Sequence, residues 1–196
     1  MNSLARRVLQ SSNPVQLRRT PRIDGAAQAC VGQNGKVVFS YVKRLAQEPA
    51  GKVMYRVSGG CHCRNILVDL ELVRAPDTYN PRACDCDFCR KHCASYVSDA
   101  QGSLLIRIKD ERQSGKYHQG SGIAECLFCT TCGVLIGALY RDDARLYAAV
   151  NVKVVDGREN FGAEQPVSPK TLSDSEKVKR WQDIWFSNVR IVTVDA

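Results

Sequence analysis

The sequence lacks long hydrophobic runs. No stretch of its 196 residues approaches the ~18 consecutive apolar residues of a membrane-spanning helix. There is also no apolar core of the kind found in a secretory signal peptide. We therefore expect a soluble protein in a reducing compartment, the cytoplasm in the simplest case. No internal repeat or low-complexity tract is present, and the length suits one domain plus an extension.

Acidic residues are scarce at the start of the chain. Residues 1–53 contain nine Lys and Arg residues against Asp24 and Glu48, which leaves a net charge of +7 there and +1 in the remainder. The near-neutral remainder argues against a nucleic-acid surface on the folded part, so any such binding would be weak and through the extension. Residues 1–22 have five arginines and no acid, as in a mitochondrial presequence or a disordered basic tail. We expect a basic, partly disordered extension over 1–53 and a domain over 54–196.

Short β-branched runs bounded by Gly, Asp and Asn dominate from Tyr55 onward. The pattern predicts strands over residues 66–72, 104–109, 134–140, 146–152 and 189–194, and a further strand or linker over 37–42. A helix is predicted over 173–186, because Ser173 and Glu176 match a capping box and apolar residues follow at helical spacing. Two of these, Trp181 and Trp185, should pack the helix onto a sheet. The expected fold class is mainly β with a helix near the C-terminus.

Ten cysteines stand beside only three histidines. A disulfide framework would need an oxidising compartment, whereas clustered spacing in an intracellular chain favours metal. Zinc binds thiolates well; four of them complete a tetrahedral structural site, while three leave a coordination position open. We therefore expect two zinc ions per chain, one structural and one able to meet a substrate. The seven candidate ligands are Cys61, Cys63, Cys129 and Cys132 for the structural zinc, and Cys84, Cys86 and Cys89 for the catalytic zinc.

The remaining cysteines leave one question open. Cys93 follows Cys89 by four residues and could supply a fourth sulfur, which would make the second site structural. Cys30 and Cys126 have no partner at metal-binding spacing and are expected to be core thiols. At the first pair, Gly59 and Gly60 are expected to provide the backbone freedom for a turn.

Charged and titratable residues flank the three-cysteine group. Arg82, Arg90 and Lys91 could offset its negative charge or bind a substrate carboxylate, or could form a solvated surface. His92, the candidate acid or base of the catalytic site, lies beside the group, and His118 follows Tyr117 further along. Either histidine could carry protons or could have only a surface or packing role. His62, between two ligands, should point away from their metal.

Three ordered motifs give the chain a family resemblance. They are Gly59-Gly60-Cys61-His62-Cys63, then Cys84-x-Cys86-x-x-Cys89-Arg90-Lys91, then Phe128-Cys129-x-x-Cys132-Gly133. Over about residues 54–155 the sequence resembles the glutathione-dependent formaldehyde-activating enzyme family, which includes centromere protein V. The resemblance implies a β-tent domain of short antiparallel strands, with the metal ligands assigned as above. It also implies a carbon–sulfur lyase that joins formaldehyde and glutathione into S-hydroxymethylglutathione and catalyses the reverse cleavage.

The sequence departs from the pattern of this family at several points. Arg64 stands where glycine is common, and Glu125-Cys126-Leu127 stands where many members have a basic residue before the Phe-Cys pair. A histidine-containing segment frequent near the family's C-terminus is missing. These departures concern the substrate more than the metal, so glutathione or a similar small thiol, together with an aldehyde, is the expected pair of partners.

Two other functions remain open from the sequence. A non-catalytic zinc-stabilised interaction module, as the centromeric relative suggests, would have Cys93 as a fourth ligand and a basic tail for salt-sensitive contacts. A transcription-factor zinc ribbon would have two Cys-x-x-Cys pairs, whereas this chain has two Cys-x-Cys units and no basic stripe on its domain.

Overall fold

The computed structural model describes residues 53–194. These residues form a mainly β domain with two sheets and, near its end, one longer helix, which confirms the predicted fold class. The predicted presequence over 1–22, the run over 37–42 and Cys30 lie outside the described residues, and the domain boundary near residue 54 stays a prediction. No helix within 53–194 is long and apolar enough to cross a membrane.

The two sheets share no strand. The four-stranded sheet has the order β1 (Tyr55–Gly60), β2 (Ile66–Leu72), β5 (Ser103–Ile108) and β11 (Asn188–Thr193). The seven-stranded sheet has the order β10 (Gln165–Val167), β3 (Arg82–Cys84), β4 (Ser95–Val97), β9 (Leu146–Asn151), β8 (Leu135–Arg141), β7 (Glu125–Cys129) and β6 (Ser114–His118). All five strands predicted within this region are present, with ends within one residue of the prediction. The pairs β10–β3 and β11–β5 are parallel, which differs from the all-antiparallel expectation.

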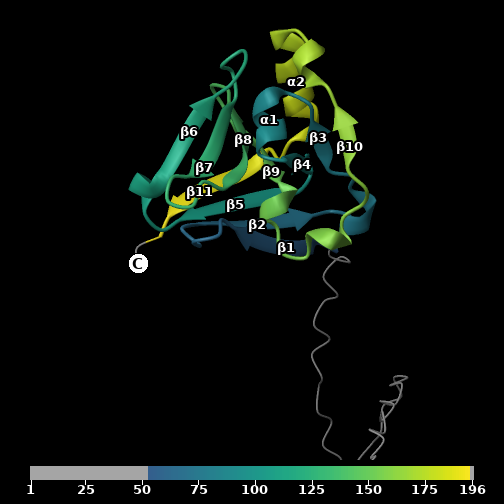
Figure 1. Cartoon of the computed structure of the whole chain (residues 1–196). Helices are drawn as coiled ribbons and strands as arrows, with labels where there is room; N and C mark the ends of the chain where they lie inside the picture. Colours follow the sequence, from purple (N-terminus) through teal and green to yellow (C-terminus); the bar gives the residue numbers. More distant parts are fainter. Residues whose placement is uncertain (1–52, 195–196) are drawn as a thin grey trace, which may run out of the picture. The chain divides into compact units, whose positions relative to one another are not determined.

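Two helices lie at one end of the domain. The helix α1 (Asp87–Lys91) is a single short turn after β3, and α2 (Asp174–Ile184) is the predicted C-terminal helix. In Figure 1, β1, β2 and β5 form the opposite end, while the ends of the seven-stranded sheet, with β6 and β7 on one side and β3 and β10 on the other, flank the two helices.

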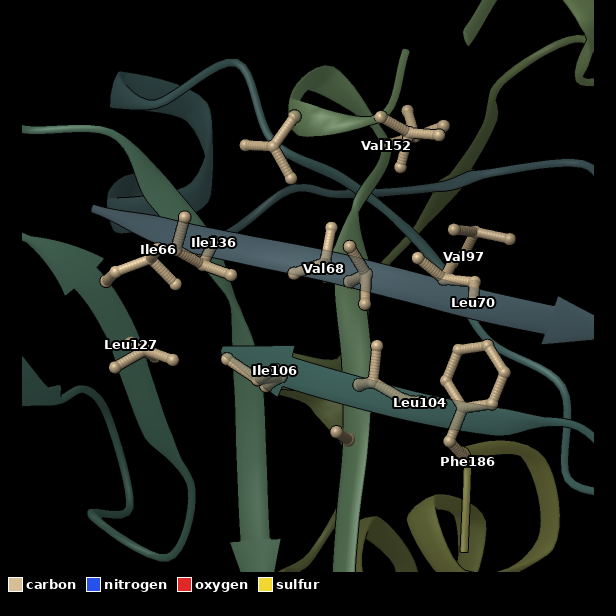
Figure 2. Packing of buried hydrophobic residues seen from close by; sticks show 14 of the residues in the cluster. Ile66, Val68, Leu70, Val97, Leu104, Ile106, Leu127, Ile136, Val152 and Phe186 are labelled. Atoms are coloured by element: carbon tan, nitrogen blue, oxygen red, sulfur yellow. The ribbon is translucent and has the colours of Figure 1, made fainter. Parts of the chain in front are cut away.

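The core forms where the inner face of the four-stranded sheet meets the larger sheet. Strand β2 alternates strictly between buried and half-buried residues, and its register places Val68 opposite Ile106 of β5. Figure 2 shows the side chains of these two strands gathered with those of Leu127, Ile136 and Phe186, which come from elsewhere in the chain. Each such side chain contributes about 1.5–3 kcal/mol when it is fully buried.

The C-terminal helix begins as the sequence predicts and connects the two sheets. Ser173 caps α2 in a complete capping box with Glu176. Trp181 and Trp185 are buried and stacked with ring centroids 5.0 Å apart, and Trp181 also packs on Tyr140 of β8 at 5.4 Å. Their predicted role in packing the helix onto a sheet is confirmed. Just after the helix, the Phe186 amide donates to the Ala148 carbonyl of β9 at 2.9 Å, and the chain then enters β11 of the other sheet.

Gly59 and Gly60 have a different role from the one expected. Both lie inside β1 with negative φ angles, and the turn that follows has its left-handed residue at Arg64, with φ of 62°. Glycine is required at position 59 for space, because a Cβ there would lie 2.0 Å from the Val154 carbonyl oxygen. Strand β1 thus meets the segment after β9 backbone to backbone at this point, where Gly59 forms a bridge with Val155.

We predict that Gly59→Ala lowers the free energy of unfolding by about 1–3 kcal/mol, the usual cost of overpacking. The backbone of residues 154 and 155 would have to move away to admit the methyl group. Urea unfolding measures the change, with exposed Ser58→Ala in the same strand as the control, for which less than about 0.5 kcal/mol is expected. Equal stability of the two variants would contradict the close approach.

Candidate metal centres and active site

Four cysteines from two distant turns meet in the structure. Cys61 and Cys63 lie in the turn after β1, while Cys129 ends β7 and Cys132 lies in the turn that follows. All four sulfur atoms lie within 4.8 Å of one another. The Sγ atom of Cys63 is 3.6 Å from that of Cys61 and 3.4 Å from that of Cys129. Zinc–sulfur bonds of about 2.3 Å place sulfurs about 3.8 Å apart in a tetrahedral site, so this donor set fits zinc.

The local backbone explains why these thiols converge. The Cys61 amide donates to the Ile66 carbonyl at 2.9 Å, and the Ile66 amide donates to the Cys61 sulfur at 3.2 Å, which closes the first turn. The second turn is a knuckle in which the Gly133 amide donates to the Cys129 carbonyl at 2.9 Å, with Gly133 at φ of 73°. Left-handed φ angles favour glycine, so Gly133 suits this position.

The thiols of the four-cysteine cluster differ in acidity. Burial raises the pKa of Cys61 to about 12. Burial would also raise the pKa of Cys132, but hydrogen bonds from the backbone and from the Cys129 thiol lower it to about 6. Without metal, the Cys132 thiol therefore loses its proton at a lower pH than the Cys61 thiol. Metal binding would release the proton of Cys61, so affinity for a metal ion would rise with pH.

The three-cysteine cluster is local in sequence. Cys84 ends β3, Cys86 is the N-cap of α1, and Cys89 lies three residues further along that helix. The Cys89 amide donates to the Cys86 sulfur at 3.5 Å, so the Cys-x-x-Cys spacing is that of a helix cap and its third residue. The three sulfurs lie within 4.8 Å of one another. A hydrogen bond with Cys89 lowers the pKa of Cys84 to about 6, and the same bond together with burial raises that of Cys89.

Cys93 does not belong to this cluster. It is exposed, has φ of 48°, and is absent from the group of sulfurs that the described residues bring together. Cys126 is buried, as expected, but it also lines the cavity described next. Among residues 53–194, the second cluster thus consists of three thiols without a fourth cysteine.

All three thiols of this cluster line a cavity of about 230 Å³. The other walls come from both halves of the seven-stranded sheet, from the turn between β6 and β7, and from α2. Four aromatic side chains line it: Phe88, Tyr96, Trp181 and Trp185. The Tyr96 hydroxyl lies 3.2 Å from the Cys89 sulfur. Tyr96 lies in β4, a strand of only three residues, and nothing in the sequence marked it as a site residue.

Four basic side chains also line the cavity. Lys170 pairs with Asp85 at 3.0 Å, and Lys177 pairs with Asp174 at 3.0 Å. Arg82 and Arg180 have no carboxylate partner within 53–194. Burial, with the positive charge of Arg180, lowers the pKa of Arg82 to about 10. Burial likewise lowers the pKa of Arg180, which the nearby Cys84 thiolate partly offsets.

Several other residues singled out from the sequence lie away from the cavity. Arg90 and Lys91 are exposed and are not among its lining residues. His92 is exposed at the C-cap of α1, with its ring 4.6 Å from that of Phe88. His118 is exposed as well, and its Nδ1 atom lies 2.9 Å from the Gly122 carbonyl oxygen.

Two further residues singled out from the sequence also lie away from the cavity. His62 is exposed. Tyr117 stacks on the outer side of the site, with its ring 5.0 Å from that of Phe88. Of the candidate base and charge-offset residues named from the sequence, the structure therefore brings only Arg82 to the cavity.

The chain matches a known protein family. The model of the glutathione-dependent formaldehyde-activating enzyme family matches residues 56–170, more than half of the chain. The chain belongs to this family. The matched span holds all seven clustered cysteines, but it ends before α2 and β11 begin.

The chain is also similar to a solved structure. The crystal structure of a Rhodobacter sphaeroides protein has 26% sequence identity and a TM-score of 0.42, covering 56% of this chain and 97% of that one. No curated protein matches the chain.

We predict that wild-type protein holds two zinc ions per chain and that each of the variants Cys132→Ser and Cys89→Ser holds one. Elemental analysis of purified protein measures the zinc content. The two variants should differ in stability, because only the four-cysteine cluster joins the two sheets. For Cys132→Ser we expect a loss of at least about 3 kcal/mol, a fraction of the roughly 10–16 kcal/mol that zinc supplies to zinc-finger peptides. Equal destabilisation by both substitutions would contradict this division.

We predict that Cys93→Gly keeps both zinc ions and stabilises the domain by about 0.5–1 kcal/mol. The left-handed backbone at this residue costs a non-glycine side chain about 1–2 kcal/mol, and the greater flexibility of glycine in the unfolded chain offsets part of the gain. Cys93→Ala is the matched control, since it removes the thiol and keeps the strain. Loss of one zinc in both variants would show that Cys93 is a ligand.

Proposed function

We propose that this protein is a zinc-dependent carbon–sulfur lyase resembling S-(hydroxymethyl)glutathione synthase, acting on a small thiol and an aldehyde. The observation that carries the proposal is the three-thiol cluster on the wall of a cavity of about 230 Å³, in a chain of the formaldehyde-activating family. A cavity of this size suits a small molecule. Glutathione and formaldehyde are the first pair to test.

The two clusters would have separate tasks. Cys61, Cys63, Cys129 and Cys132 would hold a structural zinc, and Cys84, Cys86 and Cys89 the catalytic one. Bound there, zinc would supply Lewis acidity and favour the thiolate form of a substrate sulfur. Three protein thiolates leave room for such a ligand, because zinc in proteins is commonly four-coordinate.

The reaction itself is an addition. A sulfur–carbon bond forms as one bond of the aldehyde carbonyl opens, and the thiol proton ends on the new hydroxyl oxygen; cleavage reverses these changes. The protein's share would be to hold the thiol and the aldehyde together and to limit access of bulk water, for which the cavity offers four aromatic side chains. Positioning of this kind accelerates a two-molecule reaction without a strong acid or base.

Tyr96 has a specific task in this scheme. Burial and the neighbouring sulfurs raise the pKa of Tyr96, so the phenol keeps its proton. It can therefore donate a hydrogen bond to the Cys89 thiolate across the 3.2 Å that separates them. This bond fixes the orientation of one ligand and reduces its negative charge.

The position of Cys93 favours this enzyme over the alternative of a non-catalytic interaction module. That alternative requires a fourth protein sulfur, whereas Cys93 is exposed and outside the cluster. Reduced thiols as ligands favour the cytoplasm, which we propose as the location. A mitochondrial location depends on residues 1–22, outside the described region.

We predict that the zinc-loaded full chain accelerates adduct formation between formaldehyde and glutathione. The rate, measured by exchange spectroscopy, should rise in proportion to the protein concentration. Cys86→Ser should lower the catalysed rate by at least about 100-fold, because removal of one stabilising group in an active site typically costs 10²–10³. Cys93→Gly should retain the rate. A wild-type rate no greater than the spontaneous reaction would exclude this pair of substrates.

A further inference from the structure

The helix α2 forms a wall of the cavity although it lies outside the family match. The match ends at residue 170, and α2 begins at Asp174. From α2 and the residue after it, Lys177, Arg180, Trp181 and Trp185 line the cavity. In Figure 1, α2 lies at the same end of the domain as α1, which carries Cys89. This wall is therefore a feature of this chain beyond the residues that the family model matches.

Two guanidinium groups in this cavity have no anionic partner within the described residues. Of the four lining cations, the two lysines pair with carboxylates, but Arg82 and Arg180 pair with none. Both are half-buried, and a guanidinium partly removed from water is stabilised by an anion or by hydrogen-bond acceptors. Two such groups lining one cavity suit a negatively charged ligand.

The position of Arg82 is fixed by α2. Its Nη2 atom donates to the Ser98 hydroxyl oxygen at 2.6 Å, and that hydroxyl donates to the Ile184 carbonyl at 2.7 Å. Ile184 is the last residue of α2, so this pair of hydrogen bonds connects Arg82 to the same helix that carries Arg180. One helix thus controls both guanidinium groups.

We propose that Arg180, together with Arg82, binds a carboxylate of the substrate, so that the site selects thiol acids over neutral thiols. The thiol part of this inference rests on the proposed function. Guanidinium groups bind carboxylates through paired hydrogen bonds in one plane, which fixes direction as well as position. An anchored carboxylate would direct the thiol of the same molecule toward Cys84, Cys86 and Cys89, which line the same cavity. Arg180 is then a specificity-determining residue supplied by α2.

Ligand binding to the zinc-loaded full chain tests this without any turnover. The chain has two tryptophans, and both line the cavity, so their fluorescence reports occupancy. Glutathione and 3-mercaptopropionate are each titrated against their methyl esters, and propionate serves as an anion without a thiol. We expect each acid to bind about 10- to 100-fold more tightly than its ester, the range for hydrogen bonds to charged groups. Propionate should compete only weakly.

Variants of Arg180 assign the preference to one residue. Arg180→Gln should lower the affinity for the acids about 10-fold or more and leave that for the esters unchanged. Arg180→Lys should retain part of the preference, because the charge remains but the planar pair of donors is lost. Lys179→Gln, at the exposed residue just before Arg180 on the same helix, is the charge-matched control and should change neither affinity. Zinc content and thermal unfolding of each variant confirm that the fold is intact.

The results distinguish this inference from the proposed function. Acids and esters that bind wild-type protein equally, or an acid preference that survives in Arg180→Gln, would overturn the role of Arg180 even if adduct formation is catalysed. Conversely, a preference that disappears in Arg180→Gln supports the anion site even if formaldehyde proves to be the wrong aldehyde. Inorganic phosphate that displaces the acids at equal concentration would reassign the site to phosphate esters and would count against a carboxylate substrate.

Discussion

Two turns far apart in the sequence meet at sulfur atoms 3.4 Å apart, one after a strand of the smaller sheet and one after a strand of the larger. Other backbone contacts connect β1, and the chain that leads into β11, to β9 and the residues after it. Gly59 bridges to Val155, and Phe186 pairs with Ala148 just before the chain returns to the smaller sheet. The apolar core lies between these connections. A metal ion shared by four thiols would fix the angle between the sheets, which sets the shape of the larger sheet and of the cavity it helps to form.

The second cluster depends on the fold in a different way. Its three sulfurs come from six consecutive residues, so a strand end and a single helical turn are enough to assemble them. The surroundings, however, come from the whole domain: Tyr96 from β4, Cys126 from β7, and Arg180 from α2. Metal ligands that are close in sequence can thus keep the same metal chemistry, while residues from distant elements change which substrate reaches the site.

Sequence patterns predicted five of the longer strands, the late helix and the grouping of cysteines, but no strand was predicted at β1 or β7. Strand β2 was predictable because one of its faces is buried along its whole length, so apolar residues alternate. The strands β3, β4 and β10 have three residues each, too few to show a period, and they form because neighbouring strands offer hydrogen bonds. Strand β6 was missed for a related reason, since its last three residues, Lys116, Tyr117 and His118, are all exposed.

The cavity itself was less accessible to sequence reasoning. Proximity along the chain suggested Arg90, Lys91 and His92 as companions of the cysteines, but α1 directs all three to solvent. Arg180 lies about ninety residues later, in a helix whose pattern predicted packing of Trp181 and Trp185 and did not show that these rings also form the wall of a cavity. Contacts of this kind depend on how helices and strands from distant parts of the chain pack together. The hydrophobic pattern within one segment does not show this.

The helix α2 begins at a self-contained cap, ends at a backbone pairing with β9, and contributes no cysteine to either cluster. The helix is thus attached at its two ends and covers a cavity whose cysteine ligands come from other segments. Such a cover can be exchanged as a unit: grafting a helix of different charge between Ser173 and Phe186 would retarget the pocket and leave the sulfur chemistry in place. Proteins that share these metal-binding segments can then diverge through their C-terminal segments.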